Sequence, residues 1–435
     1  METIRTNGQI FDDGQAIEVV RRQAGDDTNK LALLYFDGRQ SRITDQLELN
    51  GKNYEPTEVT ADLLRAVRFP TEPRDFDSPA ALVKNLGAII EEYSGLSDRL
   101  SRLTALYVVG TWLYDLVGTA PRLIVHGSPG RAVDQLQKIL NCVCRHTIAL
   151  ADVTPGSLLS VPFPLGVTLL IRQRKMTERL RRFLLASGSG DQFIRHGGGF
   201  INPFCPVVLQ VEEVSDSGVS VIELPMRVTR QEIPFLDSAA AAAIAEELQG
   251  QLLAYRLANL HEARGSNFDP TELTSAVRET ARSIGACFPS DPTLQAELVS
   301  LLRSADAHAR VLSSTSQEAI TAEALLYLCH QKNGSGCDEI YVGEIAEAVR
   351  VLNQGRGEMS NPSPRALGEV LRALGFATEK LDKHGRGVLL GREIYRKIHE
   401  VACDFDAPSL AAGMHGCDEC TLVRGVQTQR LSLRR

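Results

Sequence analysis

The stretch Leu123-Ile-Val-His-Gly-Ser-Pro-Gly-Arg-Ala-Val-Asp-Gln-Leu136 decides how this 435-residue chain is interpreted. Its three apolar residues, 123–125, predict a short buried strand. Gly127 and Gly130 then predict a turn, and residues 134–140 predict a helix. A strand, a glycine turn and a helix in this order are the architecture of a phosphate-binding loop, in which backbone N–H groups hold the anion.

The residues that give such a loop its catalytic chemistry are missing. With Gly127 as the first motif glycine, the Gly-Lys-Ser/Thr positions hold Ala132, Val133 and Asp134. A carboxylate in place of the hydroxyl that binds magnesium would repel a phosphate. We therefore expect a nucleotide-binding frame that has lost hydrolysis; the alternative is an ordinary strand–turn–helix with two glycines. The residues of this degenerate loop are Gly127, Gly130, Arg131, Val133 and Asp134.

A second buried strand, residues 167–171, leads to the same expectation. In a P-loop ATPase this strand ends in an acidic pair that holds magnesium and polarises water. Here it is followed by Arg172 and Gln173. Because both positions that matter have changed, we expect no ATP turnover above background and weak or no ATP binding. The basic residues that follow predict either a solvated helix face or a phosphate-contacting patch; they are Arg174, Lys175, Arg179, Arg181 and Arg182.

Composition sets the broad class of the protein. The net charge of −7 gives no global attraction to nucleic acid or membrane, so such a contact must be a local patch. No apolar run is long enough to cross a bilayer, since even residues 103–116 are interrupted by Thr and Asp. The nine cysteines are scattered and we identify no leader peptide, so we expect reduced thiols in a cytoplasmic protein. We expect Cys142 and Cys144 to be buried thiols near His146 rather than metal ligands.

Periodicity and turn signals divide the chain into five segments. A small β-rich module is expected over 1–75, with turns at Asp37-Gly38 and Asn50-Gly51. A parallel α/β core of the P-loop kind is expected over 76–236. A helical lid or spacer, whose first helix is capped by Ser238, is expected over 237–316. A winged helix-turn-helix over 317–403 and a flexible, cysteine-containing tail over 404–435 complete the chain.

The winged helix is predicted from its own start and stop signals. Ser363 at the N-cap with Pro364 at the first helical position begins a helix over 365–374, and Gly375 ends it. A hairpin over 378–390 and a closing helix over 392–402 follow. Positive charge on the recognition helix and the wing favours contact with duplex DNA; a winged helix used only for protein contacts is the alternative. The DNA-binding candidates are Arg365, Arg372, Lys380, Lys383, His384 and Arg386.

The tail offers one weak metal motif. Cys417 and Cys420 have the spacing of a zinc knuckle, but no second ligand pair is recognised, so a closed site would need a partner's ligands. We therefore expect neither zinc nor another cofactor.

Two stretches, Tyr107–Val117 and Pro121–Gly130, resemble the entry to the ATPase core of bacterial and phage helicase-like AAA+ proteins. The resemblance covers about residues 80–400. It implies an AAA+ core with a C-terminal winged helix, a role in replication or a mobile-element system, and assembly with itself or an active AAA+ paralogue. The family's functional residues do not carry over at Val133, Asp134, Arg172 and Gln173, which puts ATP hydrolysis in doubt. The resemblance continues through Val167–Ile171, Leu184–Gly188, Phe204–Val208 and Val221–Met226.

Three functions follow from these observations. The first is a non-hydrolysing, AAA+-like accessory protein that binds duplex DNA through its winged helix and contacts no membrane. The second is a divergent ATPase or helicase in which Lys138 or Lys175 replaces the missing lysine and Glu212 or Glu213 the missing acids. Lys138 argues against it, since it lies more than a helical turn beyond the usual position. The third is a structural subunit whose winged helix contacts protein.

Overall fold

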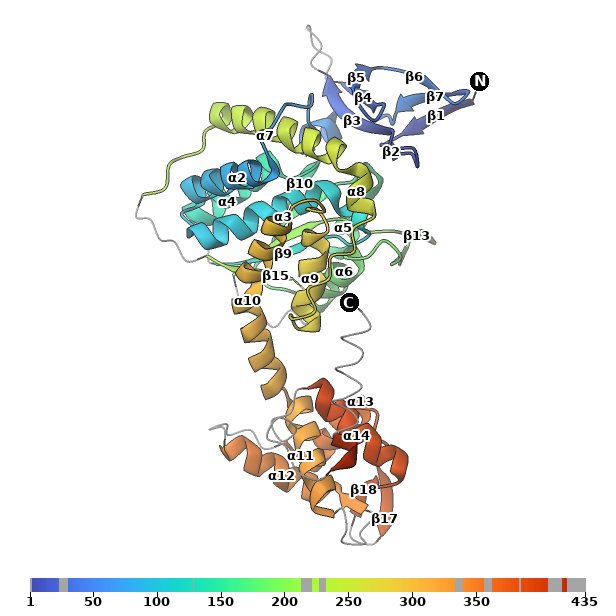
Figure 1. The fold of residues 1–435 in the computed structure, drawn as a ribbon, viewed down its shortest axis with the longest axis vertical. Helices are drawn as coiled ribbons and strands as arrows, with labels where there is room; N and C mark the ends of the chain where they lie inside the picture. The colour runs from blue at the N-terminus through green and yellow to red at the C-terminus, as the bar shows by residue number, and fades with distance from the viewer. Residues whose placement is uncertain are drawn as a thin grey trace. The chain divides into compact units, whose positions relative to one another are not determined.

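The computed structural model describes residues 2–22, 30–127, 129–212, 221–226, 232–332, 339–355, 362–382, 385–405 and 417–420. The chain forms two compact units, Met1–Asp306 and Ala307–Arg435. Figure 1 labels their helices and strands.

Two small sheets begin the first unit. One has the order β1 (Glu2–Thr6), β7 (Lys52–Pro56), β6 (Leu47–Leu49), and the other is antiparallel with the order β2 (Gln9–Ile10), β3 (Ala16–Arg22), β4 (Lys30–Phe36), β5 (Ser41–Thr44). The turn predicted at Asn50-Gly51 joins β6 to β7, and both residues have positive φ, +52° and +73°. The turn predicted at Asp37-Gly38 joins β4 to β5, where the Asp37 carboxylate accepts from the N–H groups of Arg39 and Gln40.

A six-stranded sheet forms the centre of the first unit. Its order is β15 (Ile222–Pro225), β9 (Arg122–His126), β14 (Val207–Val211), β11 (Thr168–Arg172), β10 (Thr147–Ala151), β8 (Val67–Arg68). All neighbours are parallel except the antiparallel edge strand β8. The parallel strands thus follow the order fifth, first, fourth, third, second along the chain. This mixed α/β fold fits the P-loop-like core that the sequence predicts, and β9 lies where the strand order reverses, the usual place for a ligand crevice.

Helices cover one face of this sheet. α4 (Arg131–Val143) packs on α2 (Pro79–Ser94) and α7 (Ser238–Ala258), and α2 packs on α3 (Asp98–Val117), as Figure 1 shows. The predicted helices over 80–117 are therefore present. Trp112 of α3 is buried, and its Nε1 donates to the carbonyl of Val143 at 2.9 Å.

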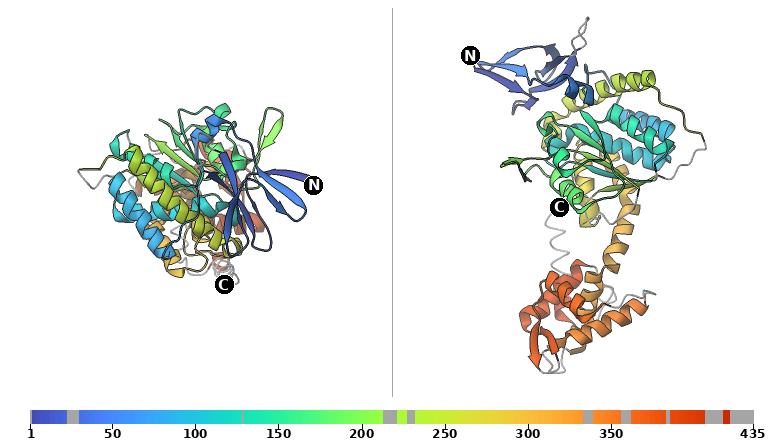
Figure 2. Two further views of the ribbon diagram at one scale, coloured as in Figure 1. Left: turned by 90° about the horizontal axis from the view of Figure 1, so that it is seen from above. Right: turned by 180° about the vertical axis from the view of Figure 1, so that it is seen from behind.

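The other face of the sheet shares one hydrophobic core with the N-terminal strands. Alternate residues of β11 and β14, such as Leu169 and Leu209, belong to one cluster with Phe183 of α6 (Glu178–Ser187) and Leu33 of β4. Strand side chains alternate between faces, which explains this spacing of two. Figure 2 shows the sheet, its helix layer and the N-terminal strands in two further views.

The remaining elements of the first unit are α1 (Ala61–Ala66), α5 (Pro155–Leu158), the 3-10 turn η1 (Phe163–Leu165), the hairpin β12 (Ile194–His196) and β13 (Gly199–Ile201), α8 (Leu260–Arg264) and α9 (Ser275–Gly285). The longer helix α10 (Pro292–Thr315) follows, and its last residues belong to the second unit. The cap predicted at Ser238 is wrong. Asp237 is the N-cap of α7, and its carboxylate accepts from the N–H of Ala240 at 2.8 Å. A charged acceptor also interacts better with the helix dipole than a hydroxyl does.

The second unit follows the order helix, strand, two helices, hairpin, helix. Its elements are α11 (Gln317–Lys332), β16 (Glu339–Tyr341), α12 (Val342–Gly355), α13 (Pro364–Ala373), β17 (Glu379–Asp382), β18 (Gly385–Leu389) and α14 (Arg392–Asp404), and its sheet has the order β16-β18-β17. Leu325, Ile345 and Leu367 belong to its core.

The start and stop predicted for α13 are confirmed. The Ser363 side chain accepts from the N–H of Ala366 at 3.3 Å, and Pro364 is the first helical residue. Gly375 has a φ of +81°, and the next N–H, of Phe376, donates back to the carbonyl of Leu371 at 2.8 Å. This pattern satisfies carbonyls at the helix end and requires the left-handed backbone that glycine adopts readily.

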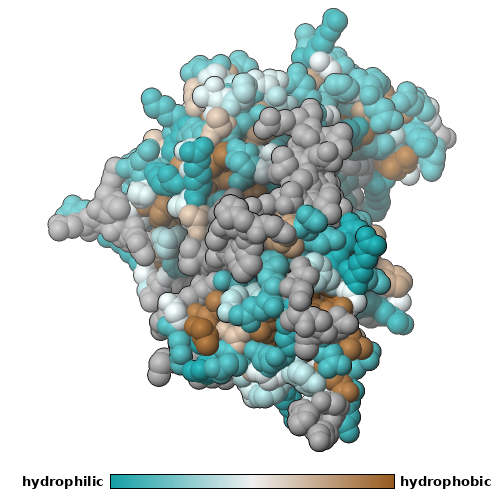
Figure 3. Space-filling model, turned by 60° about the horizontal axis from the view of Figure 1, so that its bottom comes forward, coloured by the Kyte–Doolittle hydropathy of each residue, from teal (hydrophilic) through white to brown (hydrophobic). Residues whose placement is uncertain are grey.

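None of the helices among the described residues has both the length and the apolar character needed to cross a bilayer. On the face drawn in Figure 3, hydrophilic residues predominate and hydrophobic ones form scattered areas.

Candidate functional sites

The predicted glycine turn lies between β9 and α4, at the carboxyl end of β9. A Cβ at Gly127 would approach the Cβ of Met226 to 2.8 Å, and the Met226 N–H donates to the carbonyl of His126 at 2.8 Å. Position 127 therefore needs glycine because the chain leaving β15 packs against it. Gly130 has an extended backbone that any residue adopts, with a φ of 175°. Ser128 lies outside the described residues.

The residues that replace the magnesium-binding groups contact one another. The Arg172 guanidinium donates to the Asp134 carboxylate. Its Nε also donates to the Gln210 side-chain oxygen at 3.0 Å, and Gln210 Nε2 donates to the Gly127 carbonyl at 3.2 Å. A hydrogen-bonded chain thus links the ends of β11, β14 and β9 to the first turn of α4.

At the predicted nucleotide site, these hydrogen bonds include one pair of opposite charges. Asp134 lies at the hydroxyl position and Arg172 at the acid position, so each neutralises the other. Val133, at the lysine position, is 3% exposed and belongs to the core. Gln173 donates instead to the carbonyl of Val153 at 2.7 Å.

A cleft of ≈ 840 Å³ lies beside α4 and is lined by Arg131, Asp134, Lys138, Arg172 and Phe235, among others. The Lys138 ammonium lies 4.4 Å from the centroid of the Phe235 ring. This cation–π contact holds Lys138 one turn beyond Asp134, so the side chain is engaged away from the glycine turn.

Three of the arginines after β11 form ion pairs with acidic side chains of the same unit. Arg181 and Arg182 each donate to Glu178 at 3.0 Å, and these hydrogen bonds lower the pKa of the Glu178 carboxyl. Arg174 lies 3.9 Å from Glu212. The three arginines are therefore parts of local ion pairs, two on α6 and one in the segment before it.

A second basic region lies on the second unit. A groove of ≈ 980 Å³ runs between α12, α13 and β18. Arg365 and Arg372 of α13 line it together with Arg386 of β18, and all three are exposed. Among the described residues, no acidic side chain forms an ion pair with these three arginines. Glu344 and Glu369 line the same groove.

The other predicted members of this basic region belong to the hairpin. Lys380 of β17 pairs in register with Arg386, whose guanidinium donates to the carbonyl of Thr378. Lys383 and His384 lie outside the described residues. The structure thus brings four of the six predicted positions, on α13 and the hairpin, to one unit.

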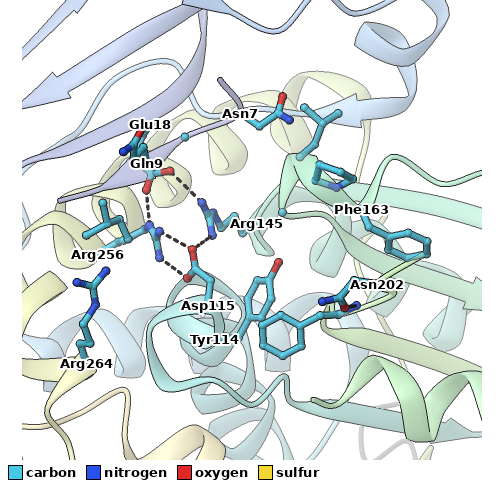
Figure 4. A pocket seen from close by; sticks show the side chains of 16 residues that line it. Asn7, Gln9, Glu18, Tyr114, Asp115, Arg145, Phe163, Asn202, Arg256 and Arg264 are labelled. Carbon is cyan, nitrogen blue, oxygen red and sulfur yellow. Dashed lines mark hydrogen bonds and ion pairs between the residues drawn. The ribbon is translucent and has the colours of Figure 1, made fainter. Parts of the chain in front are cut away.

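Sequence reasoning missed a buried ionic cluster in the first unit (Figure 4). Arg256 of α7 contacts Glu18 of β3 and Asp115 of α3, each at 2.7 Å. Arg145 contacts the same two carboxylates at 2.9 and 3.0 Å. We call these four residues the buried quartet. Its only sequence signal was Asp115 interrupting an apolar run.

Electrostatics inside the buried quartet favour four charged groups. Burial alone would raise the pKa of the Glu18 and Asp115 carboxyls, but the guanidiniums of Arg256 and Arg145 outweigh it and lower both pKa values. The quartet lines a cavity of ≈ 420 Å³ with Tyr114 and Phe163. Because each carboxylate already contacts two guanidiniums, the cluster is a structural one.

The two thiols at the end of α4 are buried as predicted. Cys142 and Cys144 are 2% and 0% exposed. The neighbouring ring of His146 contacts the carbonyl of Leu165 through Nδ1 at 2.7 Å, and burial lowers the pKa of His146 to about 3.

Comparisons with known proteins leave the family of this chain open. No family model matches it, and no curated protein does. The C-terminal region of NrS-1 aligns over 86% of this chain and 97% of its own length, at 12% identity and a TM-score of 0.35. A full-length MCM homolog from Methanopyrus kandleri aligns over 67% of this chain and 74% of its own, at 12% identity and a TM-score of 0.38. Drosophila ORC bound to DNA aligns over 76% and 95%, at 12% identity and a TM-score of 0.17.

Proposed function

We propose that this chain is a non-hydrolysing, AAA+-like accessory protein of a replication or mobile-element system, which binds duplex DNA through a winged helix formed by residues 317–403. The observation that carries the proposal is the set of exposed arginines along one groove that form no ion pair with an acid among the described residues, Arg365, Arg372 and Arg386. In this proposal, residues 237–316 serve as a helical lid or spacer, and the protein acts in the cytoplasm with itself or an active AAA+ paralogue.

The topology of the second unit supports a winged helix. α12 and α13 contact each other as the two helices of a helix-turn-helix do, and β17 and β18 form the hairpin of a wing. α13 buries Leu367 and Leu371 and exposes Arg365 and Arg372. An exposed basic face on the second helix suits the major groove, while Lys380, Lys383, His384 and Arg386 suit the phosphates beside it.

We place DNA in the groove of the second unit because its arginines have no acidic partner among the described residues. An arginine that already donates to a carboxylate must give up that contact to bind phosphate, whereas an unpaired arginine gains one. Three arginines without acidic partners, close to Lys380, form the strongest such arrangement among the described residues. Glu344 and Glu369 add negative charge to the groove and would discriminate against some orientations of a duplex.

The absence of hydrolysis is supported by the Asp134–Arg172 pair. For an ATP-bound magnesium ion to bind beside Asp134, this carboxylate would have to give up the guanidinium of Arg172, which would also have to leave Gln210. The carboxylate would then repel the phosphates of ATP. With Val133 buried at the lysine position, no ammonium reaches the phosphates. A divergent ATPase would have to use Lys138, which is engaged with Phe235.

DNA binding is tested by fluorescence anisotropy of the full chain on a labelled duplex at about 50 and 200 mM salt. We expect affinity to fall with salt, with a log–log slope of roughly one unit per phosphate contacted. The matched control is Arg181→Ala with Arg182→Ala, which removes two arginines from α6 and should leave the slope unchanged. If the wild-type chain shows no salt-sensitive binding to the duplex, the DNA proposal fails and the winged helix is assigned to protein contacts.

ATP is tested separately, so that one failure does not conceal the other. We expect no turnover above background and no binding of a fluorescent ATP analogue. Turnover that is abolished by Lys138→Ala or Lys175→Ala, and by Glu212→Gln or Glu213→Gln, would contradict this expectation and support the divergent ATPase.

A further inference from the structure

Four side chains with metal-ligating atoms converge in the second unit: His330, His399, Cys417 and Cys420. Their ligand atoms, two imidazole nitrogens and two thiol sulfurs, all lie within 4.8 Å of one another. The two Nε2 atoms are 3.0 Å apart. Cys417 Sγ lies 3.3 Å from His399 Nε2, and Cys420 Sγ lies 3.4 Å from His330 Nε2. We call these residues the histidine–cysteine cluster.

The cluster joins three parts of the chain. His330 lies in the last turns of α11, His399 lies on α14, and the cysteines lie on the short segment 417–420. His399 is 0% exposed and Cys420 7% exposed, so the cluster adjoins the core of the second unit. The expectation that a closed site would need a partner's ligands is therefore wrong, because this chain supplies the second pair itself.

The hydrogen bonds among these atoms compete for the same lone pairs. His399 Nδ1 lies 2.8 Å from the carbonyl of Tyr395, an acceptor, so this nitrogen carries the proton and Nε2 presents its single lone pair. That lone pair faces both His330 Nε2 and Cys417 Sγ, and it can accept only one proton. If both thiols donate to the imidazoles, the two Nε2 lone pairs face each other at 3.0 Å without a proton between them. One cation at the centre would accept all four lone pairs at once.

The distances also suit a small tetrahedral ion. Zinc–nitrogen bonds of about 2.0–2.1 Å and zinc–sulfur bonds of about 2.3 Å place neighbouring nitrogens about 3.3 Å apart and nitrogen and sulfur about 3.6 Å apart. The three corresponding separations here, 3.0, 3.3 and 3.4 Å, need a slight expansion around an ion, and the widest pair, within 4.8 Å, needs a contraction.

The surroundings orient the ligands as they do in metal sites. The contact from His399 Nδ1 to the Tyr395 carbonyl is the usual outer contact of a metal-bound histidine, since it fixes the tautomer and the plane of the ring. The hydroxyl of Tyr395 lies 3.6 Å from Cys417 Sγ, where it can donate to a thiolate.

We propose that the histidine–cysteine cluster binds one zinc ion in a closed tetrahedral Cys₂His₂ site. Two thiols and two imidazoles favour zinc over magnesium or calcium, which prefer oxygen ligands. Binding converts Cys417 and Cys420 to thiolates and releases two protons to solvent. With four protein ligands no position is left for water or substrate, so the ion is structural.

The site gives residues 417–420 a defined place in the second unit. Cys417 and Cys420 come after residues 406–416, which lie outside the described residues, and the ion would hold them against α11 and α14. The proposal is independent of the proposed DNA binding, because none of the four ligands lines the groove of Arg365 and Arg372.

Metal content of the full chain tests the proposal directly. The protein is produced in zinc-supplemented medium and purified without a metal-affinity step, and zinc is counted by mass spectrometry. We expect about one zinc per chain in the wild type and less than about 0.1 in the double variant Cys417→Ser with Cys420→Ser. The matched control, Cys403→Ser, removes a thiol from the same helix as His399 and should keep about one zinc.

Cobalt gives a second measurement on the unaltered chain, which does not depend on whether a variant folds. Replacing zinc by Co²⁺ should produce the thiolate-to-cobalt charge-transfer band and the ligand-field bands of a tetrahedral site. A wild-type chain with less than about 0.1 zinc and no such bands would overturn the proposal. So would a double variant that keeps its zinc, or a Cys417–Cys420 disulfide in the protein purified under reducing conditions.

Discussion

Arginines form two surface regions of this chain, and the regions differ in whether acidic side chains pair with the arginines. Beside the glycine turn and on α6, Arg172, Arg181 and Arg182 all donate to carboxylates of the same unit. On the second unit, Arg365 and Arg372 line a groove without an acidic partner among the described residues. The sequence shows the first region as the denser basic run, yet the second has the charge available for a ligand.

The difference teaches that the number of basic residues is a poor guide to anion binding. Exposed ion pairs are worth only about 0–1 kcal/mol, but each one occupies the donors that a phosphate would use. In a third arrangement, the buried quartet, pairing is most complete, because each carboxylate contacts two guanidiniums. Its two guanidiniums and Glu18 are at most 5% exposed, and Asp115, 31% exposed, completes the pairing at the edge of the cluster. Variants of all three arrangements should therefore give effects of different kind and size.

The largest effect is expected where pairing is complete and buried. Asp115→Ala leaves Arg145 and Arg256 with one carboxylate between them and should lower the free energy of unfolding by about 3–5 kcal/mol. Chemical denaturation followed by circular dichroism measures this change. DNA affinity of the variant at a temperature where it is folded should equal that of the wild type. A loss below 1 kcal/mol would show that water already screens the quartet.

The pH dependence of the same cluster has a definite sign. Since the pKa values of Glu18 and Asp115 are lowered in the folded state, the quartet contributes stability above the unfolded-state pKa values near 4. That contribution is lost as the pH falls from about 5 through the folded-state pKa values, because the unfolded chain takes up the protons first. Over this range the unfolding free energy of Asp115→Asn should decline less steeply than that of the wild type.

The next largest effect is expected in the groove of the second unit. Arg365→Glu with Arg372→Glu replaces two unpaired cations by anions and should weaken duplex binding by at least about 30-fold, or roughly 2 kcal/mol. Because both side chains are exposed, the denaturation midpoint should stay unchanged. Anisotropy at two salt concentrations measures the affinity. Equal binding by the variant and the wild type would place DNA elsewhere on the chain.

A smaller effect is expected at the glycine turn. Asp134→Ala removes the partner of a half-exposed arginine and should change the unfolding free energy by no more than about 1 kcal/mol. ATP turnover should remain absent, since the lysine position still holds Val133. A variant that gained turnover would show that Asp134 alone blocks an otherwise competent site.

The smallest effect is expected on α6. Arg181→Ala with Arg182→Ala removes two exposed partners of Glu178 and should change stability by less than about 0.5 kcal/mol. Duplex affinity should stay within about twofold and the salt slope should not move. A flatter salt slope would show that Arg181 or Arg182 contacts phosphate, and α6 would then no longer differ from the groove in this respect.

Local signals account for what the sequence predicted well. The Asn50-Gly51 turn, the strand before Gly127, the helices over 80–117 and the Ser363-Pro364 helix start all depend on neighbouring residues, and all are present. Ser238 fails for the same local reason, because Asp237 beside it is an equally good cap. The parallel sheet could be inferred from the alternation of strands and helices.

Long-range contacts explain what the sequence did not predict. Asp134 and Arg172 are 38 residues apart, and their pairing depends on β11 lying near β9 in the sheet. His330 and Cys420 are 90 residues apart and meet only after α11 and α14 pack. Nothing in the local pattern of either pair indicates its partner.

The buried quartet also has a consequence for synthesis. Glu18 and Arg256 are separated by 238 residues. At about 5–20 residues per second, a ribosome delivers Arg256 some 12–48 s after Glu18. Until then the acid on β3 lacks one of its two guanidiniums, and a chain that buried it early would carry an under-compensated charge. The N-terminal strands should therefore complete their packing only after α7 has emerged, which makes this core a late event during translation.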